Sequence, residues 1–194
     1  MVVIDERSGS LIVPIGTDLD SILGCVKIDK LTPQFELVRY GLTLSNVQAL
    51  MTSLKDSPCR RLSLEMNNID DIACPFIRDY LIQPSCQLRY LNLASNPISS
   101  GAIPLLQALA TNTNLRTLDL SYCDITDDII NKCIPHILVN ETLILVNLIG
   151  NHIADSKMRQ IAVKMASNQV KFDALDTSIS RETQAMKKED NAAL

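Results

Sequence analysis

The chain has 194 residues, of which 46% are hydrophobic and 21% are charged, a balance that predicts a folded domain with a substantial core. Only 4% of the residues are aromatic and none is Trp, so this core has to be aliphatic. The net charge of −4, without a basic run, argues against a surface for nucleic acid or lipid. No apolar run approaches the roughly 20 residues of a membrane-spanning helix.

The first residues and the cysteines indicate a cytoplasmic protein. Residues 1–7 carry acidic side chains and lack the apolar core of a secretory signal. The six cysteines form no Cys-x-x-Cys pair, and the chain has only two histidines, His136 and His152. We therefore expect reduced, mostly buried thiols, with no metal site and no cofactor.

One pattern of apolar residues recurs along the chain and organises it. Residues 88–98 read L-x-x-L-x-L-x-x-N-x-I, with Asn96 at a landmark position after the leucines. The same spacing recurs around Asn67, Cys123 and Asn151, so the landmark positions are 29, 27 and 28 residues apart. A period of this length predicts a stack of strand–turn–helix units.

The repeat length also locates a degenerate first unit and the helix of each unit. Counting back 27 residues from Asn67 gives Tyr40, with Phe35, Leu37 and Leu42 at the apolar positions. After each strand, apolar residues recur at helical spacing. The expected helical faces lie within residues 47–54, 72–81, 103–109, 129–137 and 158–165.

Both ends of the chain depart from the pattern. Residues 10–15 are typical of a short strand, and residues 18–23 of a helical turn opened by an Asp cap. Residues 170–175 are expected to form a last, worn strand, and the polar sequence after them a frayed or weakly helical tail, or a segment folded over the last unit. The predicted division is an N-terminal cap at 1–31, a repeat domain of about five units plus a terminal strand at 32–175, and a polar tail at 176–194.

These units resemble the ribonuclease-inhibitor-like class of leucine-rich repeats. Unit length, the motif of residues 88–98 and a helix in each return segment carry the resemblance, which covers residues 32–175. The implied fold is an α/β solenoid, a horseshoe with a parallel β-sheet on its concave face and α-helices on its convex face. The stack has to bend, because a helix is about 10 Å wide whereas strands lie about 4.8 Å apart. The landmark asparagines are expected to satisfy backbone groups after each strand.

Residues between the leucines should point out of the concave face and form rows across the strands. The central row is Glu36, Ser63, Asn92, Asp119, Asn147 and Ala174, and the row before it is Gln34, Arg61, Tyr90, Thr117, Leu145 and Phe172. Tyr90 and Tyr122 combine a large contact area with a polar group, as residues of interaction hot spots do. We predict that a protein partner docks through Arg61, Glu65, Tyr90, Asn92, Asp119, Tyr122 and Asn147. The alternative is a solvated sheet face.

A second feature lies at the C-terminal edge of the predicted sheet. Leu145, Ile149 and Phe172 would occupy outward positions on the last two strands. An exposed apolar cluster of this kind predicts a cover, which the tail, another protein or a second copy of the chain could provide.

No motif indicates an enzyme. Glycine-rich phosphate loops are absent, and neither histidine has a Ser or Cys at a spacing typical of a catalytic pair. The acidic pairs Asp70-Asp71 and Asp127-Asp128 fit the starts of helices, where negative charge meets the helix dipole. We therefore expect a non-enzymatic scaffold for protein–protein interaction, with no nucleic acid and no membrane among its partners.

The family resemblance leaves two alternatives open. Its members include inhibitors, cytoskeletal and axonemal proteins, and the activating protein of the Ran GTPase. One alternative is a structural subunit of a cytoskeletal or axonemal assembly, which the imperfect ends and the apolar edge favour. The other is a GTPase-activating protein of the Ran-activator type, with Arg39 and Arg61 as the candidates for contacting a transferring phosphoryl group.

Overall fold

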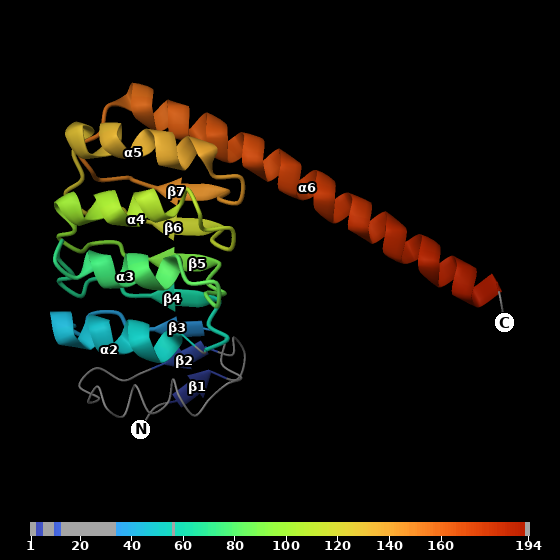
Figure 1. Ribbon diagram of the computed structural model, residues 1–194, viewed down its shortest axis with the longest axis horizontal. Helices are drawn as coiled ribbons and strands as arrows, with labels where there is room; N and C mark the ends of the chain where they lie inside the picture. Colours follow the sequence, from blue (N-terminus) through green and yellow to red (C-terminus); the bar gives the residue numbers. More distant parts are fainter. Residues whose placement is uncertain (1–2, 6–9, 13–33, 56, 193–194) are drawn as a thin grey trace.

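A computed structural model describes the backbone of residues 3–5, 10–12, 34–55 and 57–192, and the side chains of 34–55 and 57–177. Its strands are β1 (Val3–Asp5), β2 (Ser10–Ile12), β3 (Gln34–Glu36), β4 (Arg61–Ser63), β5 (Tyr90–Asn92), β6 (Thr117–Asp119) and β7 (Leu145–Asn147). Its helices are α2 (Leu44–Leu54), α3 (Cys74–Leu81), α4 (Ala102–Ala108), preceded by the 3-10 turn η1 (Ser99–Gly101), α5 (Asp127–Val139) and α6 (Asp155–Ala192). Figure 1 shows the strands stacked in chain order, with the helices as a second layer beside them.

The strands form one sheet in the order β1-β2-β3-β4-β5-β6-β7. From β2 to β7 each strand pairs parallel with the next, whereas β1 pairs antiparallel with β2. Gln34, Arg61, Tyr90, Thr117 and Leu145 pair across the sheet, which is the register predicted for the first row, including its worn first unit. The predicted α/β solenoid with a parallel sheet is therefore confirmed.

The core is aliphatic and continues from unit to unit. The mid-strand residues Phe35, Leu62, Leu91 and Leu118 pair in register, and none of their side chains is exposed. Buried residues of α2, α3, α4 and α5 belong to the same core. Complete burial of one such side chain contributes about 1.5–3 kcal/mol, so the shared interior is the main source of stability.

The landmark asparagines join each unit to the next through the backbone. Asn96 is 1% exposed, and its Oδ1 accepts the N–H groups of Asn67 at 2.9 Å and Ile69 at 3.0 Å. Its Nδ2 donates to the carbonyls of Leu64 at 3.0 Å and Leu93 at 2.8 Å. These contacts confirm the predicted structural role, because one amide satisfies backbone groups of two neighbouring units.

Cys123 occupies the landmark position of the next unit. Its thiol donates to the carbonyl of Leu93 at 3.2 Å, but a thiol is a weak donor and has no amide oxygen to accept N–H groups. One unit further on, Asn151 restores the amide, and its Oδ1 accepts the N–H groups of Cys123 at 3.0 Å and Ile125 at 2.9 Å. The unit that contains Cys123 is therefore bound less tightly to the unit before it.

The predicted last strand is wrong, because residues 170–175 lie inside α6. Three residues after Asn112 and Asn140 stand Leu115 and Leu143, which are fully buried at the start of a strand segment. The equivalent residue after Asn168 is Lys171, whose ammonium group pairs with Glu141 instead. By the same count, Ala174 and Asp176 stand where Leu118 and Leu120 are buried. A strand here would therefore bring too few apolar side chains to the core, and the chain stays helical.

Helix α6 also includes most of the predicted C-terminal tail. Its backbone stays helical to Ala192, and Figure 1 shows its second half leading away from the solenoid, so the alternative of a tail folded over the last unit is wrong. No helix in the described part of the chain is both long and apolar enough to cross a membrane.

The N-terminal prediction is tested only in part. Strand β2 confirms the expected strand at residues 10–12, and the expected helical turn at 18–23 lies outside the described residues. The division of the chain into cap, repeat domain and tail stays a prediction.

Five of the six cysteines have buried, free thiols, and Cys25 lies outside the described residues. Burial is the main cause that raises the pKa of Cys59 and of Cys74 to about 12. Burial also raises the pKa of Cys123 and of Cys133 to about 11. Their environment is that of unreactive core residues, as expected from the sequence.

The landmark position gives a pair of substitutions with opposite effects. Asn96→Ala should lower the free energy of unfolding by about 2–4 kcal/mol, because it leaves buried backbone groups of two units without partners. Cys123→Asn should raise it by about 1 kcal/mol, because it restores an amide at the weak junction. Urea unfolding followed by circular dichroism measures both. A loss below about 1 kcal/mol for Asn96→Ala would contradict this account.

The buried thiols predict a loss of stability in alkaline solution. Below about pH 9 the thiols are protonated in the folded and the unfolded chain, so they add no pH dependence. Above it, the unfolded chain ionises while Cys59 and Cys74 stay protonated up to about pH 12, so the free energy of unfolding falls. Urea unfolding at pH 8, 9 and 10 measures the fall. Replacing both cysteines by Ala should remove about 1.4 kcal/mol of the total fall between pH 8 and pH 10 for each thiol, and an unchanged fall would refute their role.

Candidate protein-binding site

We call the side of the sheet that points away from the helices the open face. Its rows run across β3 to β7 and continue into the turns after the strands. The predicted sixth members of these rows, Phe172, Ala174 and Asp176, lie in α6 and do not belong to it. The remaining rows are Gln34, Arg61, Tyr90, Thr117 and Leu145; Glu36, Ser63, Asn92, Asp119 and Asn147; and Val38, Glu65, Ala94, Ser121 and Ile149.

A cation–π pair lies at the middle of the open face. Arg61 and Tyr90 are paired residues of β4 and β5, and the guanidinium carbon lies 3.6 Å from the ring centroid. Both side chains are half-buried. Burial raises the pKa of Tyr90, Arg61 lowers it, and the negative charges of Asp119, Glu65 and Glu36 raise it again. Three carboxylates therefore act on one tyrosine, which stays protonated at neutral pH and can donate a hydrogen bond.

Asn92, the third residue of β5, forms hydrogen bonds close to this pair. Its Nδ2 donates to Ser63 Oγ and to Glu65 Oε2, both at 3.2 Å, and its Oδ1 accepts the N–H of Ala94 at 2.9 Å. Only 8% of Asn92 is exposed, so it offers a partner little contact area. Its amide instead contacts the partly exposed carboxylate of Glu65.

Asp119 and Asn147 form a second polar cluster on β6 and β7. Asp119 Oδ1 accepts the N–H and the hydroxyl of Ser121 at 2.9 and 2.6 Å, and Oδ2 accepts Asn147 Nδ2 at 2.9 Å. Within the described part of the chain, Glu36, Glu65 and Asp119 take part in no ion pair. Their negative charge is therefore available to a partner.

Tyr122 lies at the rim of the open face, five residues after Thr117, and so is not beside Tyr90. It adopts a left-handed backbone with φ of 54°, and 62% of it is exposed. Gly150 makes room for its ring, because a Cβ there would lie 2.3 Å from Tyr122 Cδ1. The absence of a side chain at residue 150 thus leaves space for the Tyr122 ring in this position.

The two arginines proposed for phosphoryl contact lie apart. Arg39 is at the rim, where its Nε donates to Met66 Sδ at 3.0 Å. Arg61 is in the first row, paired with Gln34, and stacks on Tyr90. The fold does not bring these two guanidinium groups to one point.

A row of arginines at the start of the strands was missed in the sequence. Arg60, Arg89 and Arg116 directly precede β4, β5 and β6, and the N–H groups of Arg89 and Arg116 each donate to the carbonyl of the arginine before, at 2.8 Å. None of the three takes part in an ion pair with a described residue. Their common position, one residue before the predicted strand, was visible as a sequence signal. The starts of these strands therefore carry a row of positive charges, next to the strands that bear the acidic residues of the open face.

Comparison with known sequences identifies the repeats. Family models described as leucine-rich repeats match residues 87–109 and 111–130. NLR family member X1 of Rattus norvegicus is 36% identical over 70 residues, which cover 36% of this chain. The human NLR family member X1 is 37% identical over 60 residues, which cover 30% of the chain. The matched segments span only 7% and 6% of the length of these relatives.

Comparison with solved structures confirms the fold over most of the chain. Leiomodin-1 actin-binding site 2 superposes with a TM-score of 0.77 at 18% identity, covering 88% of this chain and 99% of that one. The tropomodulin C-terminal domain of Caenorhabditis elegans gives a TM-score of 0.72 at 15% identity, covering 84% and 99%. Taken together, the repeat register, the asparagine contacts and these matches show that the chain is a leucine-rich repeat protein.

Proposed function

We propose that this protein is a non-enzymatic scaffold that binds a protein partner on the open face of its sheet. The observation that carries the proposal is the Arg61–Tyr90 stack, which has unpaired carboxylates on one side and an arginine row on the other. Tyr and Arg dominate interaction hot spots, because they bury a large area and keep a polar group. Opposite charges on one face favour a partner of complementary pattern, and so give specificity.

The residues first predicted from the sequence take different parts in this proposal. Arg61, Tyr90 and Tyr122 would supply the contact area, and the carboxylates of Glu65 and Asp119 would receive basic or hydrogen-bonding groups of the partner. Asn92 and Asn147 would hold these carboxylates through their amides. This assignment follows from exposure, since Asn92 is buried whereas Tyr122 is largely exposed.

A structural subunit of a cytoskeletal assembly is the second candidate. It is favoured by the fold similarity to an actin-binding site of leiomodin-1 and to a tropomodulin domain, over nearly the whole of those chains. The free, buried thiols support the cytoplasm as the compartment. A GTPase-activating function has less support, because Arg61 is held against Tyr90 and Arg39 lies at the opposite end of the strand segment.

Three substitutions on the open face test the proposed site. Tyr90→Ala, Asp119→Ala and Tyr122→Ala together should reduce capture of native partners by more than about tenfold, since each hot-spot residue contributes about 2 kcal/mol. Quantitative mass spectrometry of pull-downs from native extract measures the loss.

The matched control lies on the helix side of the solenoid. Ile82→Ala and Val139→Ala change residues that are 48% and 61% exposed in the helical layer, and should leave capture unchanged. If the triple variant keeps its helical circular dichroism and still captures the same partners, the binding site lies elsewhere. If both variants lose capture equally, the open face has no special role.

A further inference from the structure

The sheet ends at β7 with one edge unpaired among the described strands. Helix α6 continues the helical layer above α5, so the place of an eighth strand lies between β7 and α6. A groove of about 380 Å³ occupies this place, and its walls are mainly apolar. Ile144, Leu145 and Val146 form one wall, and Met158, Ile161 and Met165 of α6 form the other.

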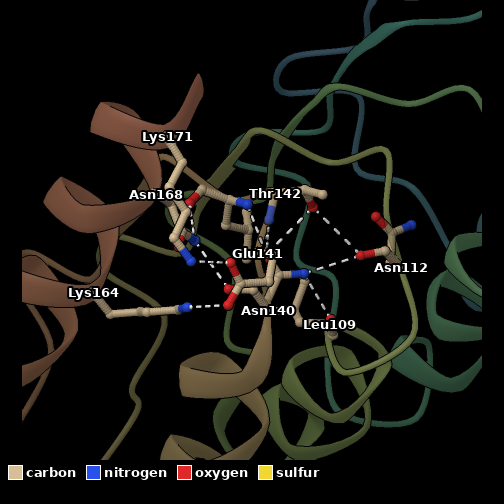
Figure 2. A network of polar contacts seen from close by, with 9 residues as sticks. Leu109, Asn112, Asn140, Glu141, Thr142, Lys164, Asn168 and Lys171 are labelled. Atoms are coloured by element: carbon tan, nitrogen blue, oxygen red, sulfur yellow. Dashed lines mark hydrogen bonds and ion pairs between the residues drawn. The ribbon is translucent and has the colours of Figure 1, made fainter. Parts of the chain in front are cut away.

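A second asparagine ladder marks how the chain leaves each helix. Asn112, Asn140 and Asn168 are 28 residues apart, and Figure 2 shows them side by side with Glu141 and Thr142. Asn140 Oδ1 accepts the N–H groups of Thr142 at 2.8 Å and of Leu143 at 2.7 Å, on the way into β7. Asn112 Oδ1 does the same one unit earlier, with N–H groups at 3.1 and 2.8 Å. In both units this oxygen positions the segment that leads into the next strand.

Asn168 has the same place but no strand after it. Its Nδ2 donates to the carbonyls of Asn140 at 3.0 Å and Leu143 at 2.7 Å, so the amide is anchored to the unit before (Figure 2). Its Oδ1 is buried and accepts no hydrogen bond, although the residue is only 1% exposed. An unpaired buried carbonyl is unfavourable. Because an amide is planar, this oxygen lies on the side opposite to Nδ2, where the two preceding units receive N–H groups.

The start of the groove carries an unpaired positive charge. The guanidinium carbon of Arg116 lies 5.3 Å from the ring centroid of Phe172 on α6, so the side chain reaches across from β6 to the helix. Its Nη1 donates to the carbonyl of Thr142 at 3.1 Å. Arg116 is half-buried near Arg89 and has no ion pair within the described part of the chain. A carboxylate entering at this end would find a complementary charge.

We propose that this groove binds an extended segment of a partner protein, which adds to β7 as a parallel strand. The segment exchanges backbone hydrogen bonds with the free edge of β7. Its alternate aliphatic side chains enter the groove against Ile161 and Met165, and an acidic residue near its start pairs with Arg116. The groove lies at the β7 edge of the sheet and shares Leu145 and Arg116 with the open face, and it extends the scaffold to a second kind of partner.

Two other occupants fit the groove less well. The chain's own residues after Asn168 would place Lys171 and Asp176 at positions where Leu115 and Leu120 are fully buried. A second copy related by a two-fold axis would pair β7 with β7 antiparallel, whereas Asn168 is arranged for a segment entering a parallel strand.

A displayed library of random twelve-residue peptides tests the proposal on the full chain. Selection on the wild-type protein is combined with counter-selection on Ala162→Arg, which fills the groove from an exposed position on α6. Val163→Arg is the matched control, because residue 163 is 71% exposed on the same helix and does not line the groove. Enriched peptides should alternate aliphatic residues behind an acidic residue. They should bind Ala162→Arg at least about tenfold more weakly than wild type and Val163→Arg with unchanged affinity.

Synthetic versions of the enriched peptides separate backbone pairing from simple apolar contact. Methylation of the peptide nitrogens on the edge facing β7 keeps every side chain but removes N–H donors, and should lower affinity at least about tenfold. Arg116→Gln should weaken binding of the acidic peptides and leave their Glu→Gln counterparts unchanged.

Four outcomes would overturn the proposal. The first is that no selected peptide distinguishes wild type from Ala162→Arg. The second is equal binding of the methylated peptides. The third is a dimer in analytical ultracentrifugation that Ala162→Arg disrupts and Val163→Arg does not, which would make a second copy the occupant. The fourth is a nuclear magnetic resonance assignment of residues 170–176 as a strand on β7.

Discussion

The structure depends on buried side-chain amides that complete the backbone hydrogen bonding of the unit next to them. An isolated unit would expose both an aliphatic face and unpaired N–H and carbonyl groups, so neither its core nor its turns could be stable alone. Asn96 illustrates the coupling, since its one side chain forms hydrogen bonds with the backbone of Leu64, Asn67 and Ile69 in the preceding unit and of Leu93 in its own unit. Folding is thus cooperative between nearest neighbours, and the junction at Cys123, which lacks a landmark amide, is a place where such a stack is expected to open early.

Most of the fold could be predicted because it depends on a repeated local pattern. The leucine positions and landmark asparagines specify both faces of every strand, and even the worn unit around Phe35 obeyed the count. The error at residues 170–175 came from aligning Val170, Asp173 and Leu175 with the leucine positions, whereas the 28-residue step from Asn140 to Asn168 puts Lys171 at the first of them. A lysine in a position where leucine is fully buried removes the reason for the chain to leave the helix. The 28-residue spacing of Asn112, Asn140 and Asn168 was also present in the sequence.

The candidate site could be predicted only as a set of rows. Alternation along a strand shows which side chains leave the core, and the observed register confirmed this for β3 to β7. It does not show how much of each side chain its neighbours cover. Asn92 is therefore buried under Ser63 and Glu65, although it lies in an outward row. Stacking between Arg61 and Tyr90 depends equally on rotamers, which a period in the sequence does not encode.

The left-handed turn after each strand has a consequence for how such a surface can diversify. Arg39, Met66, Ser95 and Tyr122 all have positive φ at this position, with a glycine at residue 150 in the last unit. None of these four side chains belongs to the aliphatic interior. A family of such proteins could therefore exchange the residues that decide whom they recognise while retaining an unaltered interior, so that selectivity and folding are inherited through different positions of the same unit.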